Sequence, residues 1–208
     1  MRVELVAHLP FSESVIAMAG KLTRGKHVNM FFEDKGEFIK RLIKLDHTSL
    51  VEFGYAVFYV EGVSRVLLSQ LSRHRLISLA VESQRHAKAG KGFIIPPTVQ
   101  QKKELLEKWE EILKRSYELY EEALKEKIPL EDARYILPQS VTTSFFVGAN
   151  FREWRHILKL RLHKSTQWEF REFCKKVVKI LKRIAPSVFY DFEEGEDSEQ
   201  KIEATRKE

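Results

Sequence analysis

Two short runs of basic and hydroxyl side chains have the residue types and spacing to do chemistry. Arg73-His74-Arg75 is followed, after seven residues, by Ser83-Gln84-Arg85-His86. Arginine carries a permanent charge and a planar fork that bonds oxyanions in pairs, and a serine hydroxyl adds a short neutral donor. Such a set of donors at a helix end and in the following loop is typical of phosphate binding. A solvated basic face is the alternative, and it is the commoner origin of a generic Arg-x-Arg cluster.

Periodicity predicts the elements that position these two runs. Between residues 63 and 73 apolar side chains recur at helical spacing, and Gln70 and Arg73 stand three apart on a neighbouring face, so both can reach one ligand. Residues 53–61 alternate aromatic and β-branched side chains as a strand does. Residues 78–92 break the pattern with serine and glycine, and we expect a functional loop there.

The rest of the chain predicts an α/β protein of the α+β type, with a mixed sheet flanked by helices in one domain. Further strands are expected at residues 2–9 and 140–147, and helices at about residues 12–22, 35–45, 98–126, 130–137, 151–162 and 165–184. Ser12 is the expected N-cap of the first helix. We place a single catalytic domain at residues 1–190 and a flexible acidic tail at residues 191–208.

Length and charge limit the class of protein. The 208 residues suit one domain with a sizeable core. The tail holds eight acids and three bases, so removing its −5 from the formal charge of +6 leaves +11 on residues 1–190. Residues 1–190 are therefore strongly basic, which suits anionic ligands, either small phosphates or nucleic acid. No apolar run approaches the ~20 residues that span a bilayer, and no secretory signal pattern opens the chain, so we expect a cytoplasmic protein without a membrane partner.

Several kinds of site are excluded by residues that the sequence lacks. Cys174 is the only cysteine, which rules out an intramolecular disulfide and a cysteine-built zinc site. No His/Asp/Glu pair has a metal-binding spacing, and no Gly-x-Gly-x-x-Gly run marks a Rossmann dinucleotide site. We therefore expect no metal. Cys174 lies in a helical stretch, where we expect a buried structural side chain rather than a nucleophile.

The two basic runs resemble the signature of the flavin-dependent thymidylate synthase family. Arg73-His74-Arg75 with Ser83 after seven residues matches it, and Glu61-Gly62-Val63-Ser64-Arg65, Gln70-Leu71 and Ser83-Gln84-Arg85 look like its flanks. Similar segments follow the family's order: His47-Thr48-Ser49 with Glu52, Ala133-Arg134 with Leu137-Pro138, Asn150-Phe151-Arg152, Leu158-Lys159-Leu160-Arg161, and Gln167-Trp168-Glu169. The likeness extends over about residues 1–188, which a basic surface patch does not explain.

This resemblance implies a methyltransferase that makes dTMP from dUMP, with methylenetetrahydrofolate as carbon donor, FAD as hydride carrier and NADPH as reductant. It implies a homotetramer with sites where subunits meet, and no nucleic-acid partner. Around dUMP it places Gln70, Arg73, Ser83, Gln84, Arg85, Arg134 and Arg161. Around FAD it places Ser49, Arg73, His74, Arg75, Asn150, Arg152 and His156. Arg161 is the implied catalytic residue, because an arginine at the N3–C=O edge of uracil stabilises negative charge that develops there.

The chain departs from the family's pattern at several positions. Phe53, Val81, His86 and Ser165 stand where the family usually has histidine, an acid or amide, tyrosine and histidine. These departures bear on flavin contact and turnover more than on the class of ligand. They leave open a family member that binds nucleotide and flavin with little turnover.

A basic nucleic-acid-binding module is the alternative from another class. The charge of +11 on residues 1–190 suggests it, as do the lysines of residues 165–184. An apolar stripe in the same segment, Phe173, Val177, Ile180 and Leu181, favours instead a helix with a charged outer face and a buried inner one. Binding to DNA that weakens steeply as salt rises would favour the nucleic-acid alternative.

Overall fold

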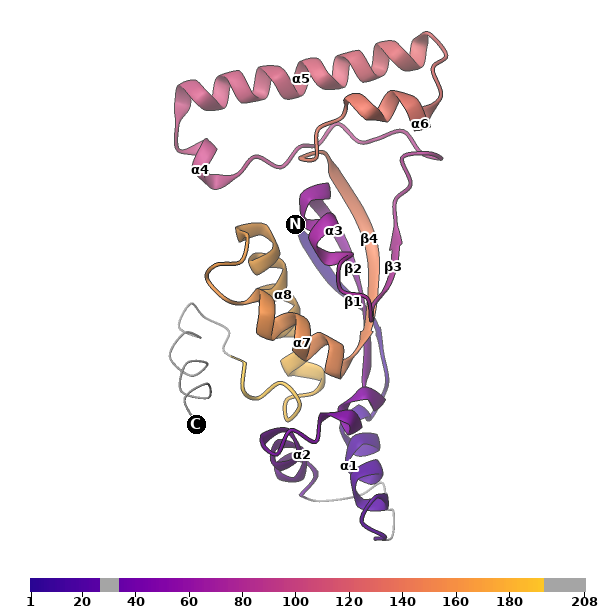
Figure 1. Cartoon of the computed structure of the whole chain (residues 1–208), viewed down its shortest axis with the longest axis vertical. Helices are drawn as coiled ribbons and strands as arrows, with labels where there is room; N and C mark the ends of the chain where they lie inside the picture. The colour runs from indigo at the N-terminus through magenta and orange to yellow at the C-terminus, as the bar shows by residue number, and fades with distance from the viewer. Residues whose placement is uncertain (27–33, 193–208) are drawn as a thin grey trace. The chain divides into compact units, whose positions relative to one another are not determined.

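The computed structural model describes residues 1–26 and 34–192. Four strands form one antiparallel sheet in the order β1-β2-β4-β3 (Figure 1): β1 (Arg2–His8), β2 (Tyr55–Ser64), β3 (Ser78–Val81) and β4 (Thr142–Asn150). Alternation along β2 buries Ala56, Phe58 and Val60 completely, as expected for a strand with one face on a core. The predicted α/β class is confirmed, whereas the sheet, predicted as mixed, is antiparallel.

The chain folds as two compact units, each assembled from separate segments. Unit 1 contains Met1–Arg2, Val60–Arg73 and Leu79–Phe146. Unit 2 contains the described residues within Val3–Tyr59, His74–Ser78 and Val147–Glu208. Strands β2 and β4 contribute residues to both units. One boundary falls between Arg73 and His74, inside the first basic run.

Unit 2 contains α1 (Ser12–Leu22), α2 (Lys35–Lys44), the 3-10 helix η1 (Thr48–Phe53), α7 (Phe151–Arg161) and α8 (Trp168–Ile184). Helix α1 packs against α2 and η1, and α7 packs against η1 and α8. Along α8, Phe173, Val177 and Leu181 are fully buried. The predicted apolar stripe is therefore part of the core.

The start of α7 is fixed by three contacts, one of them with β2. Asn150 is the N-cap, and its Oδ1 accepts from the backbone N–H of Glu153 at 2.8 Å. Trp154 donates from Nε1 to the carbonyl of Ala56 at 3.2 Å. The ring of Phe151 occupies the space beside Gly54, where an added Cβ would lie 2.0 Å from that ring. These contacts set the direction of the helix that ends at Arg161.

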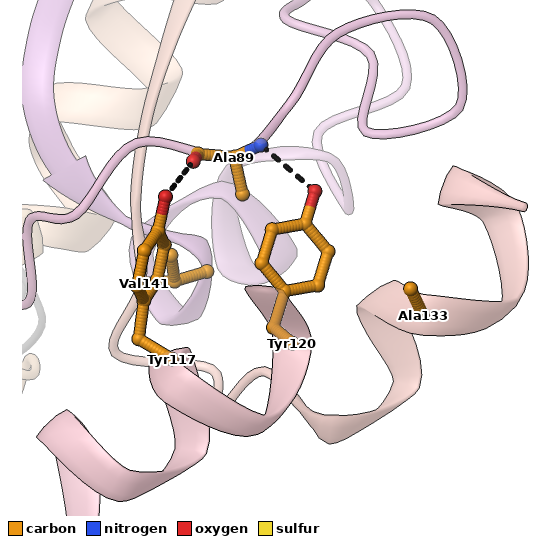
Figure 2. Close-up of a cluster of buried hydrophobic side chains, with 5 residues drawn as sticks. All are labelled: Ala89, Tyr117, Tyr120, Ala133 and Val141. Atoms are coloured by element: carbon orange, nitrogen blue, oxygen red, sulfur yellow. Dashed lines mark hydrogen bonds between the residues drawn. The ribbon is translucent and has the colours of Figure 1, made fainter. Parts of the chain in front are cut away.

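Unit 1 contains α3 (Arg65–Leu71), α4 (Pro97–Gln100), α5 (Lys103–Lys125), α6 (Leu130–Ala133) and the 3-10 helix η2 (Arg134–Ile136). Ser64 caps α3, because its Oγ accepts from the backbone N–H of Leu67 at 3.1 Å. Helix α5 packs against α4, α6 and η2. A buried cluster joins α5 and α6 to two loop segments (Figure 2), and its members are Ala89, Tyr117, Tyr120, Ala133 and Val141.

Four local predictions differ from the structure. Residues 78–92, predicted as a loop, begin with β3, because that segment pairs with β4 and Glu82 N donates to Ser144 O at 3.0 Å. The helix predicted at residues 98–126 is divided into α4 and α5, because Lys102 has extended backbone angles. Ser12 is not the N-cap of α1, since Phe11 takes that position with a left-handed φ of 53°. Helix α3 begins at Arg65 because β2 continues through Ser64.

The packed part of unit 2 extends through Phe192. Arg155, 3% exposed, donates to both carboxylate oxygens of Asp191 at 2.6 Å and also to the carbonyl of Val188. Its guanidinium carbon lies 4.9 Å from the centroid of the Phe192 ring. The first two residues of the predicted tail are therefore tied to α7, and residues 193–208 lie outside the described part of the chain.

Replacing Asp191 with asparagine is expected to destabilise the protein. Breaking a buried ion pair from one side typically costs about 3–5 kcal/mol, and we expect about 2–4 kcal/mol here because the Asp191 side chain is partly exposed. Urea unfolding measures the difference. Asp132→Asn, at an exposed position of α6, is the control and should unfold like the wild type. Equal midpoints for Asp191→Asn and wild type would show that the pair does not hold the segment.

Candidate functional site

The predicted site residues divide between the two units largely by the ligand that the resemblance gives them. Unit 1 holds most of the dUMP set: Gln70, Arg73, Ser83, Gln84, Arg85 and Arg134. Unit 2 holds most of the FAD set: Ser49, His74, Arg75, Asn150, Arg152 and His156. Two arginines depart from this division, since Arg161 lies in unit 2 and Arg73, assigned to both ligands, lies in unit 1.

In unit 2 a buried histidine holds the predicted catalytic arginine. His74 is 7% exposed, and its Nε2 accepts from Nε of Arg161 at 3.2 Å. Because Nε2 is the acceptor, the proton of the neutral ring is on Nδ1, which faces Oε1 of Glu153 at 3.7 Å. The rings of His156 and Phe170 each meet His74 edge to face, with centroids 6.0 Å away. The structure thus brings together three of the predicted residues, His74, His156 and Arg161.

The electrostatics of this cluster keep the imidazole uncharged. Burial lowers the pKa of His74 to about 4, and the charges of Arg161 and His156 act in the same direction. Burial also raises the pKa of Glu153, which the charge of His156 partly opposes. His74 is therefore neutral at physiological pH, so its contact with Glu153 is not an ion pair there.

Two neighbouring side chains orient Arg161, and they leave its terminal N–H donors available. It is the last residue of α7 and is half-buried. Its guanidinium carbon lies 4.9 Å from the centroid of the Phe170 ring, in addition to the Nε bond to His74. Within residues 1–26 and 34–192, its two terminal amino groups make no hydrogen bond. They are available to a carbonyl or an anionic oxygen.

The other four predicted flavin residues of unit 2 differ in their exposure and in their hydrogen-bond partners. Asn150 uses its side-chain oxygen as the N-cap of α7. Arg152 is paired with Glu52 at 2.6 Å, and both side chains are about half exposed. Ser49, on η1, and Arg75 are exposed, and among the described residues neither is hydrogen-bonded to His74. Helix η1, which carries Ser49, packs against α7, which carries Arg152.

In unit 1 a pocket of about 430 Å³ is lined by the predicted residue Gln84. Arg65, Ser69, Ser72 and Val81 also line it. Among the described residues, the buried Nη1 atom of Arg65 has no hydrogen-bond partner. Burial and the charge of Arg134 lower the pKa of Arg65. A guanidinium that lines a pocket favours an anion or a carbonyl group as ligand, because it carries a permanent charge and only donors.

Two predicted phosphate ligands, Arg85 and Arg134, meet at Glu131 of α6. Arg85 donates from Nε to Oε2 of Glu131 at 2.9 Å, and Arg134 donates from Nε to the backbone oxygen of Glu131 at 3.0 Å. Ser83 shapes the turn before Arg85, because its Oγ accepts from the Arg85 N–H at 3.2 Å. Arg73 is exposed at the end of α3, one turn from Gln70.

Three residues near these groups were not assigned a ligand from the sequence: Glu153, Phe170 and Arg65. Glu153 interrupts the apolar face of α7 with an acid, and a buried acid is a signal of a functional contact. Arg65 is the first residue of α3, where a positive charge opposes the helix dipole. Both signals are visible in the sequence once the helix boundaries are known. Phe170 carries no such signal, because it reads as an ordinary core residue.

The positions that depart from the family pattern lie mostly at the edges of these clusters. Val81 lines the pocket beside Arg65. Phe53, at the end of η1, is 54% exposed. In the turn before α8, the hydroxyl of Ser165 lies 2.7 Å from Nδ1 of His163. None of them contacts the pair formed by His74 and Arg161.

Two further features bear on the class of chemistry. Cys174 is fully buried, and burial raises the pKa of its thiol, which disfavours a thiolate. Among the described residues, no group of three His, Cys, Asp or Glu is placed to hold a metal ion. Over the same residues, no helix has the length and apolar character needed to cross a membrane.

The fold is shared with a solved nucleotide-modifying enzyme. A UMP/dUMP methylase, PolB from Streptomyces cacaoi, crystallised with 5-Br dUMP, aligns with a TM-score of 0.83. The alignment covers 91% of this chain and 93% of that one, at 20% sequence identity. At this identity the likeness establishes the common fold.

Sequence comparison identifies the family. The family model for thymidylate synthase complementing protein matches residues 4–187, and the chain belongs to that family. The flavin-dependent thymidylate synthase of Geobacter sulfurreducens is 30% identical over 200 residues, 92% of this chain and 86% of that protein. The one from Thermococcus onnurineus is 38% identical over 157 residues, 71% of this chain. That alignment spans 64% of the Thermococcus protein, less than two thirds of its length. The resemblance found in the sequence is confirmed.

The buried state of His74 predicts how stability depends on pH. The folded pKa of about 4 lies below the unfolded value of ~6.5, so the unfolded state binds a proton first as pH falls. The free energy of unfolding should therefore decrease by about 3 kcal/mol between pH 6.5 and pH 4. The raised pKa of Glu153 acts in the opposite direction and makes this decrease smaller. Urea unfolding across this range should show a shallower slope for His74→Gln. His8→Gln, at an exposed position, is the control, and equal slopes for all three proteins would contradict a buried neutral His74.

Proposed function

We propose that this chain is a flavin-dependent thymidylate synthase. It converts dUMP to dTMP by reductive methylation, taking the carbon from methylenetetrahydrofolate, with reduced FAD as hydride source and NADPH as reductant of the flavin. The observation that carries the proposal is the partly buried hydrogen bond from Arg161 to His74, which joins the signature run to an arginine 87 residues later in the chain. A solvated basic face does not require such a contact. Family membership supports the same reaction.

The residues of unit 2 fit FAD. Arg75 and Arg152 are exposed cations for its pyrophosphate, and His74 and His156 form an aromatic pair beside Arg161. Arg152 exchanges Glu52 for a phosphate at little cost, because water screens an exposed ion pair. When bound, FAD supplies the hydride that the reaction needs and that no amino-acid side chain can provide.

The residues of unit 1 suit the phosphate and sugar of dUMP. A phosphate dianion competes well with the half-exposed carboxylate of Glu131 for Arg85 and adds a charged partner for Arg134. Gln84 contributes an amide in the pocket, and the positive charge of Arg65 lines the same pocket. Gln70, Arg73 and Ser83 complete the proposed nucleotide site.

Arg161 is the proposed catalytic residue. Methylation at C5 of uracil draws electron density to that carbon and places negative charge on the N3–C=O edge. The two terminal amino groups of Arg161 donate to that edge and stabilise the charge as it develops. His74 acts through Arg161, because its neutral Nε2 sets the direction of the guanidinium. The bond to His74 restricts the guanidinium of Arg161, and a donor held in one direction needs little reorganisation as charge develops.

The assembly is proposed to be a cytoplasmic homotetramer in which sites form where subunits meet. Large apolar side chains that flank proposed site residues support this. Leu76 follows Arg75 and is 73% exposed, and Tyr135 follows Arg134 and is 85% exposed. Exposed apolar groups beside functional residues are typical of surfaces that a partner covers.

Replacing Arg161 with alanine tests the proposed function. The wild-type protein, reconstituted with FAD, should be yellow and should form dTMP from dUMP, methylenetetrahydrofolate and NADPH. Arg161→Ala should bind FAD and unfold normally, while its kcat falls by about 10²–10³-fold, the usual loss when one donor to a developing charge is removed. Lys159→Ala, on the exposed face of the same helix, is the control.

Two results would overturn the proposal at different points. A colourless wild-type protein that takes up no FAD would contradict the proposed flavin-dependent reaction. Unchanged turnover by Arg161→Ala would leave the reaction but remove the role of Arg161.

Cys174→Ala should keep most of its activity. The thiol is buried in α8 and its pKa is raised, so it cannot serve as a nucleophile at C6 of the pyrimidine. Loss of a small buried side chain should lower stability by about 1 kcal/mol without altering kcat. The measurements are dTMP formation and thermal unfolding. A folded but inactive variant would point to a thiolate mechanism instead.

A further inference from the structure

The backbone of Ala89 is bound on both sides by tyrosines of α5. The Ala89 N–H donates to the hydroxyl of Tyr120 at 3.1 Å, and the hydroxyl of Tyr117 donates to the Ala89 carbonyl at 2.9 Å (Figure 2). All three residues are buried, with Tyr120 completely inaccessible. One peptide segment thus has both of its hydrogen-bonding groups satisfied by a single helix.

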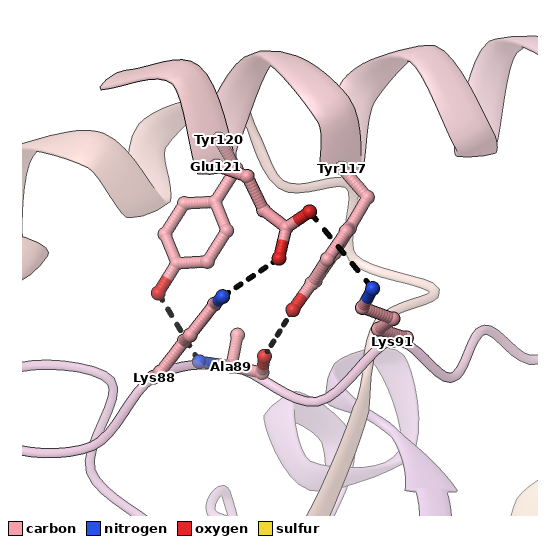
Figure 3. Close-up of polar contacts among 6 residues, drawn as sticks. All are labelled: Lys88, Ala89, Lys91, Tyr117, Tyr120 and Glu121. Carbon is pink, nitrogen blue, oxygen red and sulfur yellow. Dashed lines mark hydrogen bonds and ion pairs between the residues drawn. The ribbon is translucent and has the colours of Figure 1, made fainter. Parts of the chain in front are cut away.

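Ion pairs between α5 and residues next to Ala89 accompany these hydrogen bonds. Glu121 of α5 pairs with Lys88 at 2.6 Å, and its other oxygen lies 3.9 Å from Nζ of Lys91 (Figure 3). Nζ of Lys91 also lies 5.6 Å from the centroid of the Tyr117 ring. Because both lysines are largely exposed, we expect these ion pairs to contribute less than the buried tyrosine bonds.

The loop from residue 82 to residue 96 has attachments at its start, middle and end. At the start, the N–H groups of His86 and Ala87 donate to the carbonyl of Ser83. At the end, Thr142 N donates to Gly92 O at 2.9 Å. Between these points the conformation of the loop depends on the bonds from Ala89 to α5, because Gly90 and Gly92 leave the backbone itself little stiffness.

We propose that Tyr117 and Tyr120 are positioning residues for nucleotide binding. They hold the loop so that Ser83, Gln84 and Arg85, four to six residues before Ala89, present their donors to the phosphate of dUMP. This inference rests on the proposed function, because it takes those three residues as ligands of dUMP.

The hydroxyl groups are the informative atoms. Ring packing alone would fill the core, since Tyr117 lies edge to face with Phe93 at 6.4 Å and 5.6 Å from Tyr120. A phenylalanine keeps that packing and removes only the bond to the loop backbone. Helix α5 carries none of the proposed ligand residues, so an effect of either hydroxyl on dUMP binding must pass through the loop.

The test compares Tyr117→Phe, Tyr120→Phe and the double variant with the wild type, using the full chain reconstituted with FAD. Calorimetry with dUMP measures affinity, and steady-state kinetics measure KM and kcat. We expect the dissociation constant and KM of the double variant to rise about five- to tenfold with kcat nearly unchanged, the pattern of lost binding rather than lost chemistry. Tyr190→Phe in unit 2 is the matched control and should behave like the wild type.

Hydrogen exchange gives a reading that does not depend on activity. Peptides covering residues 86–92 should exchange faster in Tyr120→Phe than in the wild type without ligand, while peptides from α7 are unchanged. Glu121→Gln, which removes only the outer ion pairs, should have a smaller effect than either tyrosine change.

The outcomes separate this inference from the proposed function. A wild type that binds no dUMP overturns the proposed function, and this inference falls with it. A wild type that binds dUMP, with variants that bind it equally well, overturns the positioning role alone. Variants that lose cooperative unfolding would show that the hydroxyls hold the core rather than the loop, which also overturns it.

Discussion

The hydrogen bond between Arg161 and His74 can exist only while the imidazole is uncharged. A protonated ring has no lone pair on Nε2 and would place a second positive charge beside a guanidinium in a buried position. Burial therefore does more than pack the ring, because it keeps the proton off the atom that receives the arginine. The helices that bury His74 supply Glu153, His156 and Phe170 around it. The orientation of the proposed catalytic group thus depends on the packing of α7 and α8.

The two units position their basic residues by the same physical means. In unit 2, α7 is aligned at its start by the cap at Asn150 and by the bond from Trp154 to β2, and its last residue is Arg161. In unit 1, the loop that carries Arg85 is attached to α5 through Ala89. In both cases buried backbone contacts fix a segment whose charged end remains accessible. Long, flexible arginine side chains are useful as ligands only when their backbone has such support.

Local signals explain which elements could be predicted. Helices α1, α2, α7 and α8 follow from apolar spacing within single segments, so their predicted bounds are close to the observed ones. Strand β3 did not follow, because its hydrogen-bond partner lies on β4, far along the chain. The extended backbone at Lys102 and the left-handed φ at Phe11 were not predicted, because neither residue type by itself indicates that conformation. One catalytic domain over residues 1–190 stays a prediction.

The sequence by itself determined the family, the basic character of the site, the absence of a second cysteine and the residues able to bind phosphates. The assignment of those residues to dUMP and FAD stays a prediction. Only the tertiary structure decided that His74 is buried and neutral, that Arg161 bonds to it and that Arg85 is paired with Glu131. It also decided that one nitrogen of Arg65 has no partner in the part of the chain that the structure describes. The reason is physical: residue type sets what a side chain can do, whereas its pKa and its hydrogen-bond partners depend on burial among segments that are distant in the chain.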